Sequence, residues 1–139
     1  MNIIDGDYVA SAEDAIKKLK TKRLAPDKSI PVLTTSKIRN LFSMASEIYN
    51  DVVNLQDEQL EQNIIDKINY LKIKFLYETG RIDNQAPKYC KYPVRDFVEC
   101  TKIIDELDNI GESKTRFIKF FHYFEALVAY HKFYGGKDN

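Results

Sequence analysis

The stretch FIKFFHYFEALVAYH at residues 117–131 decides the fold of this 139-residue chain. At about 100° per residue, its apolar side chains share roughly a third of the helical circumference. The side chains on this face are Phe117, Phe120, Phe121, Phe124, Leu127, Val128 and His131. The pattern predicts a long helix that follows Ser113 and stops at Gly135 and Gly136.

A second stripe on the same predicted helix lies away from the phenylalanine face. Only Glu125 is charged between Phe120 and His131, and the second stripe consists of Arg116, Lys119, Tyr123, Tyr130 and Tyr134. A helix that is apolar or aromatic nearly all round is either buried on two sides or contacts a partner. We expect apolar surface of this helix to be exposed in the isolated chain and to cause self-association.

Helical periodicity extends over most of the remaining chain. The other predicted helices cover residues 12–22, 35–54, 58–80 and 93–111, with a linker at 23–33 and a loop at 81–92. Ser11 and Asp14 are expected to cap the first predicted helix, and Asp57 the third. Pro93 suits the first turn of the fourth. We predict one all-α domain over residues 1–139, a compact helical bundle of about five helices, with a flexible tail at residues 1–10.

Composition excludes several classes of protein. The chain has 21 basic and 21 acidic residues, so its net charge is zero, and no bulk field attracts it to nucleic acid. Cys90 and Cys100 are the only cysteines, which excludes a disulfide framework and a cysteine-rich zinc site. The chain carries no apolar run of about 20 residues and no signal-peptide pattern, so we expect a cytoplasmic protein.

Residues that could carry out catalysis are sparse. His122 and His131 are nine residues apart on one predicted helix, which places them on opposite faces, so they cannot share a metal ion. His131 is expected as a hydrogen-bonded core residue, and the two cysteines as structural thiols. The chain contains no P-loop, GxGxxG, HExxH or GxSxG motif. We predict no enzyme activity, no metal and no cofactor.

The charges alternate in blocks along the chain. Residues 41–66 hold six acidic and no basic residues, whereas residues 67–95 hold seven basic and two acidic ones. Neighbouring helices with such blocks give a polarised surface, or else acidic and basic helices pair with each other. Both interpretations are open at this point.

Two groups of basic residues could bind phosphates. Lys67, Lys74 and Arg81 recur every seven residues along one edge of the third predicted helix, with Tyr70 and Tyr77 beside them. Cations with adjacent aromatic rings suit a polyanion, although long basic side chains also routinely cover core edges. Lys37 and Arg39 lie near the start of the second predicted helix, where free N–H groups favour phosphate, or they are tolerated surface charges.

Three blocks of the sequence resemble a known family. They are LTTSKIRNLF at 33–42, YLKIKFLYETGR at 70–81 and FFHYFEALVAYHKFYGG at 120–136. Their order and spacing resemble the small helical subunit of the type III-A CRISPR–Cas effector, the Csm complex. The resemblance covers roughly residues 30–136, and the last block is the most specific.

The resemblance implies an antiviral, non-catalytic, RNA-binding scaffold in a ribonucleoprotein. Several copies would line up along the guide RNA and the target RNA, beside the large subunit and the repeated backbone subunit. Carried over by motif, the RNA-binding residues would be Lys37, Arg39, Lys72, Lys74 and Arg81. An RNA or subunit interface would include Arg116, Lys119, Tyr123, Lys132 and Tyr134. Phe75 and Leu76 are expected to stay in the core.

A protein-only helical interaction module without nucleic-acid contact is the alternative function. In that case the basic blocks would pair with acidic helices of partner proteins. Salt-dependent binding of RNA would distinguish the RNA-binding scaffold from this protein-only module.

Overall fold

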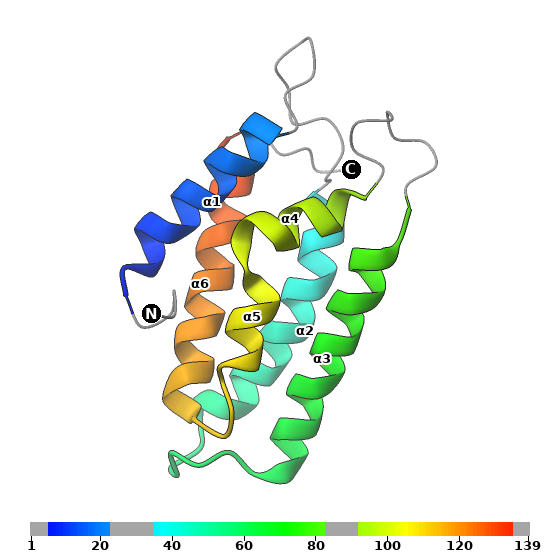
Figure 1. Cartoon of the computed structure of the whole chain (residues 1–139). Helices are drawn as coiled ribbons and strands as arrows, with labels where there is room; N and C mark the ends of the chain where they lie inside the picture. The colour runs from blue at the N-terminus through cyan, green and yellow to red at the C-terminus, as the bar shows by residue number, and fades with distance from the viewer. Residues whose placement is uncertain (1–5, 23–34, 83–91, 135–139) are drawn as a thin grey trace.

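The fold is a bundle of α-helices in a computed structural model that describes residues 6–22, 35–82 and 92–134 (Figure 1). The helices are α1 (Tyr8–Lys22), α2 (Thr35–Val53), α3 (Gln62–Gly80), α4 (Pro93–Thr101), α5 (Ile103–Asp108) and α6 (Lys114–Phe133). The described residues contain no strand, only an isolated bridge between Gln59 and Ser113. The predicted all-α bundle is confirmed, with six helices among these residues. The predicted linker at 23–33 and residues 83–91 of the predicted loop at 81–92 lie outside the described residues.

Helix α6 is the centre of the core. Its phenylalanine face is buried as predicted, and α1 and α2 pack along it (Figure 1). From α2, Phe42 packs edge-on against Phe124 and Tyr49 stacks on Phe121, with ring centroids 5.2 and 4.2 Å apart. Because two neighbouring helices cover α6, the expectation of an exposed apolar surface over its nearly uncharged stretch, from Phe120 to His131, is wrong, and Phe133 beyond this stretch is exposed. The alternative of burial on two sides holds.

Helix α1 begins four residues before its predicted start. The Asp7 carboxylate accepts a hydrogen bond from the Ala10 N–H at 3.1 Å, so Asp7 is the N-cap rather than Ser11. The helix therefore includes residues 8–10 of the predicted tail, and it buries Ala12, Ile16 and Leu19. An aspartate next to Gly6 is an ordinary N-cap signal. The predicted start at residue 12 followed the apolar pattern further along the chain instead.

The predicted helix over 93–111 is broken at Lys102. This residue adopts the left-handed conformation, with φ 59° and ψ 26°, so α4 ends at Thr101 and α5 starts at Ile103. The bend turns α5 downward along α3 (Figure 1). It also leaves the Thr101 carbonyl at a helix end, where the Tyr123 hydroxyl donates to it at 2.7 Å.

The connection between α2 and α3 is longer than predicted, because residues 55–61 pair with the start of α6. The Leu60 N–H donates to the Glu112 carbonyl, and the Lys114 N–H donates to the Glu58 carbonyl, both at 2.8 Å. The Glu58 carboxylate accepts from the Ser113 hydroxyl at 2.7 Å, the Thr115 N–H at 3.0 Å and the Thr115 hydroxyl at 2.8 Å. Glu58 therefore caps α6 from a distant part of the chain, and Asp57 does not begin α3.

We expect the capping carboxylate of Glu58 to make the stability of the fold depend on pH in the acid range. Its hydrogen bonds with Ser113 and Thr115 hold the pKa of Glu58 below the ordinary value of 4.5. A lowered pKa stabilises the folded state above the unfolded-state pKa, and this contribution disappears as the pH falls through the folded-state pKa. Glu58→Gln should therefore lower the melting temperature at pH 7 and flatten its decline between about pH 5 and pH 3. Asp57→Asn, one residue away and exposed, is the control, and identical acid profiles for wild type and Glu58→Gln would contradict the assignment.

Candidate nucleic-acid interface

Helix α3 has a buried inner face and a basic edge on either side of it. Its inner face is buried and carries Ile64, Ile68, Leu71 and Phe75, as predicted. The edge toward α2 carries the predicted basic stripe of Lys67, Lys74 and Arg81. The opposite edge carries Lys72, whose Nζ lies 2.6 Å from the Asp108 carboxylate of α5.

Two residues of the basic stripe meet at the carboxyl-terminal end of α3. Lys74 and Arg81 line a hollow of about 210 Å³ between α2 and α3, with Asn40, Leu41, Met44 and Glu78. Arg81 contacts Glu78 at 3.4 Å but remains more than half exposed. The Lys74 ammonium lies 5.2 Å from the centroid of the Tyr70 ring. This hollow therefore has a net positive charge next to an aromatic ring.

The other predicted RNA-binding residues do not join this hollow. Arg39 is exposed on α2, outside the residues that line it. Lys72 faces α5 and is held by Asp108. Lys37 belongs to α2, but its side chain lies outside the described residues. Of the five predicted positions, the structure brings together Lys74 and Arg81.

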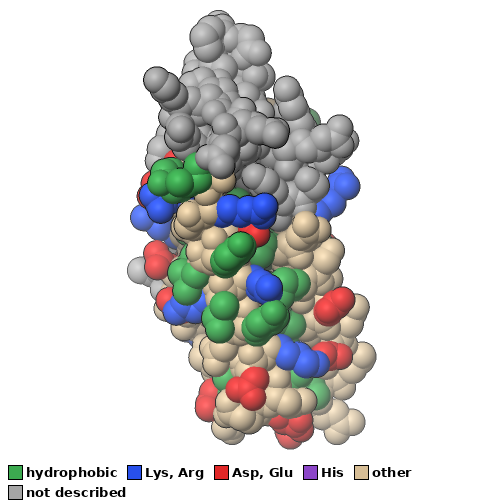
Figure 2. Space-filling view, turned by 90° about the vertical axis from the view of Figure 1, so that its right-hand side faces the viewer, with side chains coloured by type: hydrophobic (Ala, Val, Ile, Leu, Met, Phe, Trp, Pro, Cys, Tyr) green, Lys and Arg blue, Asp and Glu red, His purple; other side chains and the backbone are tan. Residues whose placement is uncertain are grey.

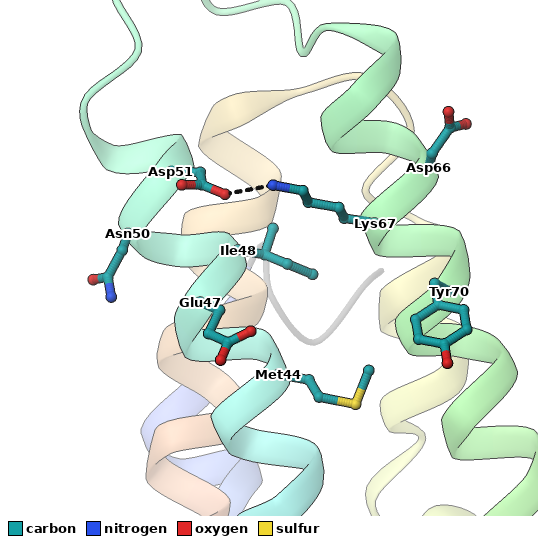
Figure 3. A pocket seen from close by; sticks show the side chains of 8 residues that line it. All are labelled: Met44, Glu47, Ile48, Asn50, Asp51, Asp66, Lys67 and Tyr70. Carbon is teal, nitrogen blue, oxygen red and sulfur yellow. Dashed lines mark hydrogen bonds and ion pairs between the residues drawn. The ribbon is translucent and has the colours of Figure 1, made fainter.

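The other end of the seam between α2 and α3 is acidic. A groove of about 630 Å³ has Met44, Ile48 and Tyr70 on its walls, with Glu47, Asn50, Asp51, Asp66 and Lys67 around them (Figure 3). The Lys67 Nζ spans the groove to the Asp51 carboxylate at 2.8 Å, and Asp66 points away from the groove. Lys67 is thus neutralised by an acidic neighbour, as the pairing interpretation of the charge blocks predicts. Phosphate is disfavoured at this end.

The outer face of α3 is apolar where a solvent-facing helix is normally polar. Tyr70, Ile73, Leu76 and Tyr77 are between 51% and 67% exposed, and Ile82 follows at 47%. Apolar and basic side chains interleave on this side of the molecule, while acidic side chains gather toward its lower end (Figure 2). The prediction of a buried Leu76 is wrong. The spacing of Tyr70, Ile73 and Tyr77, three and four residues apart, is the signal that identifies this second stripe.

The second stripe of α6 forms no continuous surface. Tyr123 is fully buried, with its hydroxyl on the Thr101 carbonyl, so it belongs to the core and contacts neither RNA nor a partner. Arg116 donates to the Asn109 carbonyl at 3.2 Å, and Tyr134 donates to Glu13 at 2.5 Å, which raises the pKa of Tyr134 to about 12. Lys119 and Lys132 are exposed. Arg116 and Tyr134 thus fasten α6 to its own neighbours.

Both histidines have structural surroundings. His131 is fully buried, and the His122 ring packs against Tyr49 and Phe121 with its Nδ1 3.5 Å from Glu125. Over the three described ranges, no group of three or more His, Cys, Asp or Glu is placed to hold a metal ion. In the same ranges, no helix has the length and apolarity that crossing a membrane requires.

Comparison with known proteins identifies the family. The family model Csm2 Type III-A matches residues 11–137, which include all six helices except the first residues of α1. The chain belongs to the Csm2 family. The resemblance seen in the three sequence blocks is thereby confirmed.

Csm2 relatives from three bacteria match most or nearly all of the chain. The "CRISPR system Cms protein Csm2" of Streptococcus thermophilus is 36% identical over 136 residues, which is 98% of each chain. The protein of the same name from Mycobacterium tuberculosis (strain ATCC 25618 / H37Rv) is 31% identical over 138 residues, which is 99% of each chain. That of Enterococcus italicus is 40% identical over 104 residues, covering 73% of this chain and 68% of the relative.

Proposed function

We propose that this chain is a non-catalytic, RNA-binding scaffold subunit of a type III-A CRISPR interference complex. It would stand in several copies along the guide RNA and target RNA, beside the large subunit and the repeated backbone subunit. The predicted cytoplasmic location is part of the same proposal. Membership of the Csm2 family supports the assembly.

One observation carries the RNA contact. Lys74 and Arg81 line the same hollow, and the exposed rings of Tyr70 and Tyr77 lie on the same helix. Cations of this kind neutralise phosphates, and exposed aromatic rings stack on bases without regard to sequence. Recognition would therefore be of backbone and shape, with sequence supplied by the guide strand.

The remaining predicted positions keep subordinate roles in the proposal. Lys37 and Arg39 on α2 would extend the contact beyond the hollow. Lys72 would bind phosphate only by leaving Asp108. Lys119 and Lys132 are exposed candidates for an RNA or subunit contact on α6.

The test is the double variant Lys74→Ala/Arg81→Ala. Each lost phosphate contact should flatten the slope of log affinity against log salt by about 0.7–0.9, equally for unrelated RNA sequences. Fluorescence anisotropy with two unrelated RNAs, begun at low salt, measures this slope. Circular dichroism should show an unchanged fold, because Arg81 is exposed, Lys74 is only half-buried, and such charges contribute little to stability.

Lys17→Ala/Lys18→Ala is the matched control, since both residues are exposed on α1, across the bundle from α3. Equal loss from the control would mean that only diffuse charge attracts RNA. A wild-type chain that binds neither RNA at low salt would favour the protein-only interaction module instead. The apolar outer face of α3 is the observation that supports this second candidate.

A further inference from the structure

Each edge of α3 carries a lysine that is paired with an aspartate of a neighbouring helix. On the edge toward α2, the Lys67 Nζ lies 2.8 Å from the Asp51 carboxylate (Figure 3). On the opposite edge, the Lys72 Nζ lies 2.6 Å from the Asp108 carboxylate of α5. The same arrangement thus occurs twice on one helix, with the two aspartates supplied by two different helices.

The cations at the carboxyl-terminal end of α3 are more open. Within the described ranges Lys74 makes no ion pair, and its ammonium lies 5.2 Å from the centroid of the Tyr70 ring. Arg81 contacts Glu78 at the longer distance of 3.4 Å, and its guanidinium has five N–H donors, so most of them remain for phosphate. The positive charge of α3 is therefore available at one end of the helix and neutralised along the rest of it.

A phosphate and a carboxylate compete for the same ammonium group. An RNA strand that follows the edge of α3 past Lys74 would reach Lys67 about 10 Å further on, because seven residues separate the two lysines. There it would meet the Asp51 carboxylate, and like charges repel. The side chains of both ion pairs are between 37% and 52% exposed, so the aspartates face the solvent from which RNA approaches.

We infer that Asp51 and Asp108 determine where RNA binds on this subunit, by holding Lys67 and Lys72 out of contact with phosphate. RNA is thereby confined to the carboxyl-terminal end of α3. Each copy of the subunit then contacts few phosphates, which keeps its own affinity for RNA low. The inference rests on the proposed RNA contact and adds to it the residues that limit its extent.

The test is the RNA affinity of Asp51→Asn, measured by fluorescence anisotropy over a range of salt concentrations. The amide keeps the shape of the side chain and removes its charge, so Lys67 becomes available for a phosphate. The slope of log affinity against log salt should steepen by about 0.7–0.9, and the affinity should rise about tenfold at about 50 mM salt. Asp108→Asn should act in the same way through Lys72. Circular dichroism should show an unchanged fold, because exposed ion pairs contribute little to stability.

The double variant Asp51→Asn/Lys67→Ala distinguishes a released lysine from a change of charge alone. It should return the slope to the wild-type value, because the lysine that Asp51→Asn releases is absent. Glu47→Gln is the matched control. Glu47 is exposed on the same groove one turn before Asp51, and it makes no ion pair in the part of the chain that the structure describes. Its substitution removes the same charge but releases no lysine, so the slope should stay unchanged.

The outcomes separate this inference from the proposed function. A wild-type chain that binds RNA with a slope that Asp51→Asn and Asp108→Asn leave unchanged would overturn the inference alone. So would a slope that steepens equally in Glu47→Gln, or one that stays steep in Asp51→Asn/Lys67→Ala. A wild-type chain that binds no RNA at low salt would overturn the proposed function, and the inference with it.

Discussion

Phe124→Ala should lower the free energy of unfolding by about 3–5 kcal/mol, the range for removing a fully buried phenylalanine. Phe124 is 0% exposed on α6 and contacts aromatic rings from three helices. Its ring centroid lies 5.2 Å from Phe42 of α2, 5.5 Å from Phe75 of α3 and 6.2 Å from Phe120 of α6. These three neighbouring rings are held in place by the backbones of their helices. The cavity that Phe124→Ala leaves therefore closes only in part.

Urea denaturation followed by circular dichroism measures this loss. Phe133→Ala, on the same helix but 76% exposed, is the matched control and should change stability by less than about 0.5 kcal/mol. A loss below about 1 kcal/mol for Phe124→Ala would mean that the three-helix aromatic contact does not hold the core.

The apolar pattern predicted most of the fold because burial on a helix follows a strict period. Ile38, Leu41, Ala45, Ile48 and Val52 of α2 are all buried as their spacing requires. Lys102 could not be foreseen, because a lysine carries no preference for the left-handed conformation that breaks α4 from α5. The capping role of Glu58 could not be foreseen either, since its partners at the start of α6 are more than 50 residues away along the chain.

The candidate site could be predicted only in part, because spacing within a helix can be read from the sequence and packing between helices cannot. The seven-residue spacing correctly aligned Lys74 with Arg81, because spacing within one helix fixes relative position. Whether an acidic residue of another helix neutralises a lysine depends on tertiary packing, as for Lys67 with Asp51 and Lys72 with Asp108. The exposure of Leu76 also depends on packing, since no helix among the described residues covers the outer face of α3.

Tyr123→Phe should lower the free energy of unfolding by about 1–3 kcal/mol, although it removes one oxygen atom only. The Tyr123 hydroxyl donates at 2.7 Å to the Thr101 carbonyl, and both residues are fully buried. Because α4 ends at Thr101, that carbonyl has no partner further along the helix, and phenylalanine would leave it unsatisfied away from water.

The pH dependence provides an independent check on the Tyr123 hydroxyl. Burial raises the pKa of Tyr123 above its ordinary value of 10.0, and the nearby Glu106 carboxylate raises it further. A raised pKa stabilises the folded state below pH 10 and loses that contribution as the pH rises beyond it, so Tyr123→Phe should flatten the loss of stability above about pH 10. Tyr77→Phe makes the same chemical change on a side chain that is 67% exposed and should leave the free energy of unfolding nearly unchanged. If Tyr123→Phe is as stable as Tyr77→Phe, the Thr101 carbonyl has another partner, and the break at Lys102 does not depend on α6.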